Sequence, residues 1–231
     1  MAKKVDIINV MHWKDLLDGC KQYHRHDQDY DVRYGYYDLL KDFEDSLHLS
    51  DEKAERVYNF LKAWGRCRTV SKRQECFPIF VEAYRRLESL VIGLRREGIE
   101  GVRLVQSTNV VHEPPILQMQ LHFIFDTWSN IKWFGPVATS KVLHLIAPNL
   151  IVMWDEDIAT ELYRIKREKM NGYYYTYYFL PKMQRLLEGA ITSYSQENMC
   201  DLQTAIASLS KGNHSLAKMM DEFNWVKAHP E

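Results

Sequence analysis

Cysteine is scarce in this 231-residue chain, and its four copies are widely spread. They form no Cys-x-x-Cys pair, which argues against a zinc site and against a four-cysteine iron–sulfur loop. The short run His24-Arg25-His26-Asp27 contains metal-binding side chains, but no third ligand follows at helical spacing, so we expect no metal there. The four cysteines are Cys20, Cys67, Cys76 and Cys200.

Long apolar runs are also missing. No stretch of about 18 apolar residues is present, which argues against a membrane-spanning helix. The start Met1-Ala2-Lys3-Lys4 lacks the apolar segment of a signal peptide. We therefore expect a soluble protein of the reducing cytoplasm that does not bind membranes.

An excess of charge of one sign is absent as well. The chain has 30 Lys and Arg against 31 Asp and Glu, a net charge of −1. Proteins that coat nucleic acid are usually basic, because phosphate contacts dominate their affinity. A near-neutral chain can still bind DNA where its cations cluster, although solvated helix faces would give the same pattern. The cations here gather within residues 62–73, 85–103 and 164–169.

Strands with alternating polarity are not evident, and helical periodicity dominates. Ser50 followed by Asp51 and Glu52 is typical of a helix start. The length allows one large or two small domains with a real core. We predict an all-α fold. The predicted helices cover residues 12–26, 34–48, 51–64, 80–94, 116–129, a stretch after Asp155, residues 183–194 and, as the last helix, residues near 199–210.

The most informative segment spans residues 130–155. Gly135 suits a tight hairpin, because a residue without Cβ lets another backbone approach closely. Pro136 suits the first turn of a helix, and the N–H groups of that turn form a site for phosphate. A carboxylate, Asp155, follows twenty residues after Gly135. A backbone phosphate grip followed by a carboxylate suggests an enzyme that acts on nucleic acid.

The segment resembles the helix-hairpin-helix superfamily of DNA glycosylases. Its signature is a hairpin ending in Gly-Val-Gly, a helix, a connector with glycine or proline, and an Asp. Here Trp133-Phe134-Gly135 stands at the hairpin and Val152-Met153-Trp154-Asp155 at the end of the connector. The resemblance covers residues 115–165 and implies two helical lobes with the active site between them. The central lobe would span residues 70–150 and end in the hairpin, and the second would combine residues 1–69 with 151–231.

The resemblance also implies a chemistry. These enzymes flip a base out of the duplex and hydrolyse its N-glycosidic bond, and a carboxylate, here Asp155, stabilises the positive charge on the sugar. Val137 stands where strand-nicking members have lysine, which implies a monofunctional enzyme that leaves an abasic site. The missing iron–sulfur loop and the tyrosine-rich run at residues 173–179 are compatible with a bacterial anti-phage enzyme that removes glucosylated hydroxymethylcytosine.

Double-stranded DNA is the expected partner, and we expect a monomer without a cofactor, except for a monovalent cation at the hairpin. An aromatic beside a cation, Trp64 with Arg66, is a candidate wall of the base pocket, as is His144. The expected DNA contacts are Lys132, Trp133, Phe134, Gly135, Val137, Ser140 and Lys141.

Each residue also has a plainer interpretation. Asp155 would make a good N-cap, and His144 among apolar neighbours would be a hydrogen-bonded core residue. The tyrosine-rich run could line a pocket or pack between helices. Two alternatives to a glycosylase therefore remain: a non-catalytic module that grips nucleic acid through the hairpin, and a helical protein-interaction domain with no DNA role.

Overall fold

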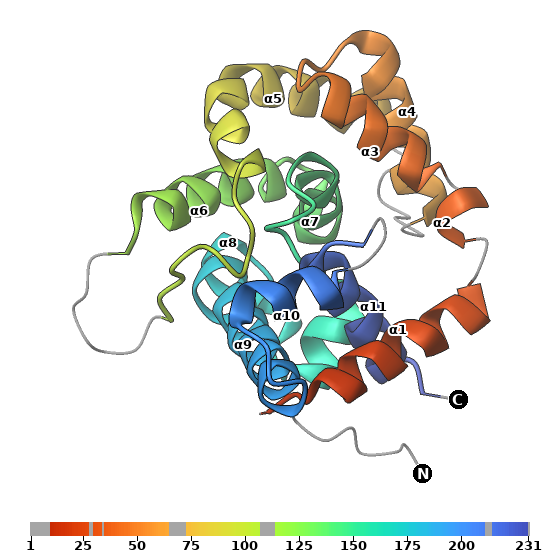
Figure 1. The fold of residues 1–231 in the computed structure, drawn as a ribbon. Coiled ribbons are helices and arrows are strands. Elements are labelled where there is room, and N and C mark those ends of the chain that lie inside the picture. The colour runs from red at the N-terminus through yellow and green to blue at the C-terminus, as the bar shows by residue number, and fades with distance from the viewer. Residues whose placement is uncertain are drawn as a thin grey trace.

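The computed structural model describes residues 10–27, 30–33, 35–64, 73–106, 114–210 and 214–230. Within these ranges every regular element is helical and no strand occurs, which confirms the all-α prediction (Figure 1). None of the described helices is both long and apolar enough to cross a membrane. The elements are α1 (Trp13–Asp27), α2 (Tyr30–Arg33), α3 (Tyr36–Asp45), α4 (Asp51–Trp64), α5 (Arg73–Arg95), α6 (Ile116–Ser129), α7 (Gly135–Ile146), η2 (Ile158–Leu162), η3 (Arg167–Lys169), α8 (Gly172–Tyr174), η4 (Tyr175–Phe179), α9 (Leu180–Glu197), α10 (Leu202–Leu209) and α11 (Leu216–Ala228).

Several helix starts lie where the sequence places them. The Ser50 hydroxyl accepts the N–H of Lys53 at 3.2 Å, the N-cap bond expected for α4. Pro115 directly precedes α6, and Pro136 lies in the first turn of α7. The helix after Asp155 was expected to continue past Ile165 and to end at Asn171-Gly172, but the π-helical segment η2 already ends at Leu162.

The prediction that the last helix lies near residues 199–210 was wrong, because α11 follows it. Ser215 caps α11 by accepting the N–H of Lys218 at 3.1 Å. Lys218, Asp221 and Glu222 are buried together with the apolar residues of this helix. Charged side chains on the buried side interrupt the apolar periodicity by which an amphipathic helix is recognised.

The helices form two groups (Figure 1). In one group α5 packs on α6, α6 on α7, and both α3 and α4 on α7. In the other, α1 packs along α11 and α9. The helices grouped with α7 therefore begin at Tyr36, earlier than residue 70, where we expected the central lobe to start. The division into two glycosylase-like lobes remains an interpretation.

Stacked aromatic rings join α6 to the C-terminal half of the chain. Phe125 of α6 stacks on Tyr175 with ring centroids 4.3 Å apart, and Tyr175 meets Trp154 edge-on at 5.1 Å. All three side chains are buried. The Tyr175 hydroxyl also donates to the Val152 carbonyl at 2.7 Å. Such rings combine a large buried area with a preferred geometry, so they fix the connector that leads to Asp155.

The packing of α1 on α11 can be tested at Gly19. A Cβ there would lie 2.7 Å from Cδ2 and 3.2 Å from Cα of Phe223, and the backbone atom cannot move aside as a rotamer can. Gly19→Ala should lower the free energy of unfolding by about 1–3 kcal/mol. Gly93 of α5 is the control: it is exposed and meets nothing within 4 Å. Gly93→Ala should raise stability by about 0.5–1 kcal/mol. Urea unfolding measures both, and an undisturbed Gly19→Ala protein would contradict this packing.

Candidate functional site

The hairpin before α7 has two residues in the left-handed region: Trp133 with φ 72° and Gly135 with φ 74°. Glycine adopts this conformation freely, whereas for another L-residue it costs about 1–2 kcal/mol. Trp133 is held there by two contacts. Its indole N–H donates to the Glu75 carboxylate at 3.0 Å, and the Lys132 ammonium lies 5.3 Å from its ring centre. The tryptophan thus takes a glycine-like backbone at the position where the glycosylase signature has glycine.

The residues expected to contact DNA at this hairpin differ in exposure. Lys132 is exposed, and Trp133, Gly135 and Val137 are partly exposed. Phe134 is buried and stacks on Phe80 of α5 with ring centroids 4.4 Å apart. Phe134 therefore anchors the hairpin to the core and does not offer its ring to a ligand.

Two further expected DNA contacts, Ser140 and Lys141, face the interior. Ser140 is fully buried, and its hydroxyl lies 3.1 Å from the carbonyl oxygen and 3.4 Å from the amide nitrogen of Trp154. Lys141 is 9% exposed, and its charge acts on the buried Asp221. Both were predicted from the sequence as DNA contacts of the helix after the hairpin. In the structure Ser140 binds the connector, so we no longer count either among the DNA contacts.

Asp155 lies close to the first turn of α7. The indole N–H of its neighbour Trp154 donates to the Pro136 carbonyl at 3.3 Å. Asp155 is partly exposed, and its Oδ1 accepts the N–H of Ile158 at 2.8 Å. The N-cap interpretation is therefore confirmed. The cap engages one of the two carboxylate oxygens and fixes the orientation of the group, which is compatible with a catalytic role as well.

His144, a candidate for the base pocket, is a core residue. It is fully buried, with Nδ1 2.5 Å from the Ile151 carbonyl and Nε2 2.6 Å from the Tyr36 hydroxyl. Since a carbonyl only accepts, Nδ1 carries the proton and Nε2 accepts from Tyr36. Burial lowers the pKa of His144 to about 3. The plainer interpretation is thus confirmed: His144 joins α3, α7 and the connector, and a flipped base has no access to it.

The other candidates for the base pocket cannot be placed. Arg66 lies outside the described residues, and for Trp64 the structure describes only the backbone at the end of α4.

A cavity of about 310 Å³ lies beside η4. Tyr174 and Tyr178 stack at 5.0 Å, and the Lys169 ammonium is 5.1 Å from the Tyr174 ring centre. Phe179 also lines the cavity and meets the ring of Trp154 at 5.3 Å, so one ring separates the cavity from the neighbour of Asp155. Aromatic faces with cations suit stacked bases and phosphates. The lining residues are Gln106, Tyr163, Arg164, Ile165, Lys166, Lys169, Tyr174, Tyr178, Phe179 and Lys182.

Only some of the residues that line this cavity could be predicted from the sequence. The sequence left two alternatives for the tyrosine-rich run, lining a pocket or packing between helices, and both occur. Tyr175 is in the core, whereas Tyr174 and Tyr178 line the cavity. The wall also includes Arg164, a non-glycine residue with positive φ, 56°. Lys182 comes from α9, and no spacing in the sequence signals that it approaches residues 163–169.

The region around α4 and α5 is less suited to phosphate. A hollow of about 590 Å³ there is lined by Asp51, Glu55 and Glu82 but by one cation, Arg85. Arg85 donates to the Asp51 carboxylate at 2.8 Å, and Arg95 donates to the Ile146 carbonyl at 2.7 Å. Part of the second basic stretch is thus used within the protein.

Comparison of the chain with protein family models, curated proteins and solved structures finds no match. A functional assignment therefore depends on the hairpin, on Asp155 and on their geometry.

His144 should make the protein less stable in mild acid. The unfolded residue protonates below a pKa of about 6.5, but the folded residue stays neutral down to about 3. Burial is the main cause of the low pKa of the folded residue. The hydrogen bond to Ile151 and the charge of Asp31 raise this pKa, and the charge of Lys218 lowers it further. Between these values the unfolded state binds more protons, so stability falls with falling pH by up to about 1.4 kcal/mol per unit.

His144→Gln removes this titration. The stability difference between wild type and His144→Gln should therefore shrink as the pH is lowered from about 7 to about 5. Urea unfolding of both proteins across this range measures it. A difference that stays constant with pH would contradict a buried neutral His144.

Proposed function

We propose that the protein is a monofunctional DNA glycosylase in which Asp155 is the catalytic carboxylate. The observation that carries the proposal is the short connection between hairpin and acid. Trp154 bonds to Pro136 in the first turn of α7, and Asp155 follows directly. Asp155 thus directly follows a residue that is bonded to the first turn of α7, a helix that begins after a hairpin with two left-handed residues.

The hairpin supplies the grip on the DNA backbone. Apart from its chain neighbours and the backbone of its own helix, no atom of the described residues lies within 4 Å of the position a Cβ would take at Gly135, so a phosphate can approach the backbone there. The N–H groups of the first turn and the helix dipole favour an anion at this point. Lys132, which is exposed, adds a positive charge beside it. These contacts are independent of sequence and position the duplex.

Asp155 supplies the chemistry. Once a base is flipped out, at a cost of a few kcal/mol, breaking the bond from C1′ to nitrogen leaves positive charge on the sugar. A carboxylate held in place by its own N-cap bond stabilises that charge without reorganising, and it can orient the attacking water. Val137 provides no amine two residues after Gly135, and Lys141 is buried. The product is therefore an abasic site on an intact strand.

The substrate we propose to test first is a bulky cytosine. The cavity at Tyr174 and Tyr178 combines aromatic faces with cations, which suits a base carrying a polar substituent. Glucosylated hydroxymethylcytosine of phage DNA is such a base. Uracil, alkylated, oxidised and mismatched bases complete the panel.

Asp155→Asn should abolish base release and keep DNA binding, because asparagine keeps the size and the capping ability of aspartate but not its charge. We expect abasic sites, revealed by alkali, with the wild type, and a loss of at least about 100-fold in the variant. Asp157→Asn is the matched control. Asp157 lies two residues further on and pairs with His229 at 3.2 Å, and its variant should remain active.

The other outcomes separate the alternatives. Salt-dependent DNA binding without abasic sites on any substrate would favour the non-catalytic module. Absence of DNA binding would favour a protein-interaction domain. Loss of activity in Asp157→Asn alone would move the catalytic role to Asp157.

Gly135→Ala should weaken DNA binding beyond its effect on stability. Gly35 is a natural control, because it has φ 72° against 74° at Gly135 and also meets nothing within 4 Å. Either substitution should cost about 1–2 kcal/mol of folding stability through backbone strain alone. Only Gly135→Ala adds a methyl group at the proposed phosphate contact. Fluorescence anisotropy with a labelled duplex measures the affinities, and equal affinities would contradict the phosphate grip.

A further inference from the structure

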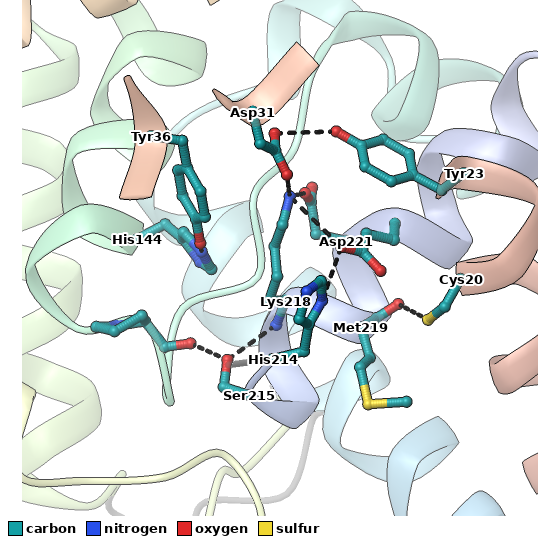
Figure 2. A network of polar contacts seen from close by, with 12 residues as sticks. Cys20, Tyr23, Asp31, Tyr36, His144, His214, Ser215, Lys218, Met219 and Asp221 are labelled. Carbon is teal, nitrogen blue, oxygen red and sulfur yellow. Dashed lines mark hydrogen bonds and ion pairs between the residues drawn. The ribbon is translucent and has the colours of Figure 1, made fainter. Parts of the chain in front are cut away.

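The contact between the terminal helices α1 and α11 contains a cluster of buried charge. Figure 2 shows Lys218 at its centre, facing Asp31 and Asp221, with His214 beside it. The Lys218 ammonium lies 3.1 Å from Asp31, 3.5 Å from Asp221 and 3.9 Å from Glu222. Lys141 adds a positive charge that acts on Asp221.

Two histidines face the third carboxylate. Nε2 of His24 lies 3.4 Å from Oε2 of Glu222, and Nδ1 of His214 lies 3.1 Å from Oε1. One nitrogen or oxygen atom from each of the three residues lies within 4.8 Å of the other two. Two donor atoms held tetrahedrally at zinc–ligand distances of about 2.0–2.2 Å are about 3.4 Å apart. The two histidine–glutamate separations, each to a different oxygen of Glu222, are close to this value, and the donor atoms of the two histidines lie within 4.8 Å of each other.

Glu222 needs such a partner. Its side chain is completely buried, and the Cys20 thiol beside it is only a weak hydrogen-bond donor. A buried carboxylate is costly unless another charge compensates it closely. The nearest lysine, Lys218, is closer to Asp31 and Asp221 than to Glu222.

The histidines are oriented and accessible. The Tyr37 hydroxyl lies 3.4 Å from Nε2 of His214, a contact that fixes the ring and leaves Nδ1 toward Glu222. Metal-bound histidines usually have such a partner on the second nitrogen. The side chains of His24 and His214 are 38% and 22% exposed, so an ion can reach them from solvent.

We propose that His24, His214 and Glu222 bind one divalent transition-metal ion, with Zn²⁺ as the best match. Imidazole and carboxylate donors at tetrahedral spacing favour zinc over magnesium or calcium, which prefer oxygen ligands and higher coordination numbers. Three protein ligands leave a fourth position for water. The ion joins α1 to α11, and this inference does not depend on glycosylase activity.

The sequence indicated only one of the three ligands. His24 was considered as a ligand and set aside, because no third ligand follows at helical spacing. The other two ligands are about 190 residues further along the chain: His214 directly precedes the N-cap of α11, and Glu222 lies on this helix, which was not predicted from the sequence.

Zinc titration of the chelator-treated full chain tests the proposal. Isothermal titration calorimetry should show one Zn²⁺ per chain, and zinc should raise the melting temperature. His214→Ala should weaken binding at least about 100-fold, because loss of a mere outer-shell partner already costs 10–100-fold, and should remove the thermal shift. His12→Ala is the matched control: His12 lies 2.6 Å from Glu197 in an exposed pair, and its loss should change neither result.

His214 is the residue of choice because it lies at the edge of the cluster, and an unchanged circular dichroism spectrum will show that the variant folds. Glu222→Gln, which keeps the volume of the buried side chain, should also lose zinc. The proposal fails if the wild type binds no stoichiometric zinc, or if His214→Ala binds it as tightly as the wild type does. The three residues would then form two histidine–glutamate ion pairs and no metal site.

Discussion

The attachment of the connector to α7 is the constraint on which the site depends. Three hydrogen-bonding contacts tie residues 151–154 to this helix: His144 binds the Ile151 carbonyl, Ser140 binds the backbone of Trp154, and the Trp154 indole binds Pro136. Each uses a buried group of the helix or the connector, so a break would leave a polar atom without a partner in the interior. The distance between the hairpin and Asp155 is therefore set by the interior of the protein and not by a surface loop.

Buried polar groups also connect segments that are distant in sequence. Tyr36 reaches His144 across 108 residues, and Lys218 of α11 meets Asp31 of α2. Together these contacts link the helices around α3 and α7 to the pair α1 and α11. Apolar packing gives most of the stability of such a fold, but it is non-directional. The polar contacts specify which helix faces meet.

The sequence predicted what is local and missed what is not. Ser50, Pro136 and Asp155 reveal helix starts, because a cap acts within one turn. Ser140 and Lys141 were predicted to contact DNA, but both are buried. A polar residue on a helix is usually exposed, and only its tertiary neighbours can bury it. The helix α11 was missed because its charged side chains are buried, which interrupts the apolar periodicity that indicates a helix. The strained backbone of Trp133 was equally beyond prediction, because the Glu75 contact that holds it comes from α5. The proposals that Asp155 is catalytic and that the protein binds DNA rest on the resemblance and on geometry together.

The conformation of Trp133 has a practical consequence. Its indole is partly exposed, lies next to a lysine and is tied to a carboxylate, so its ultraviolet emission depends on the arrangement of charges at the hairpin. An anion bound at the first turn of α7, as we propose, would alter that arrangement directly. Trp133 is one of six tryptophans in the chain, and its share of the emission would report occupancy of the hairpin in solution without a dye attached to the protein or to its ligand.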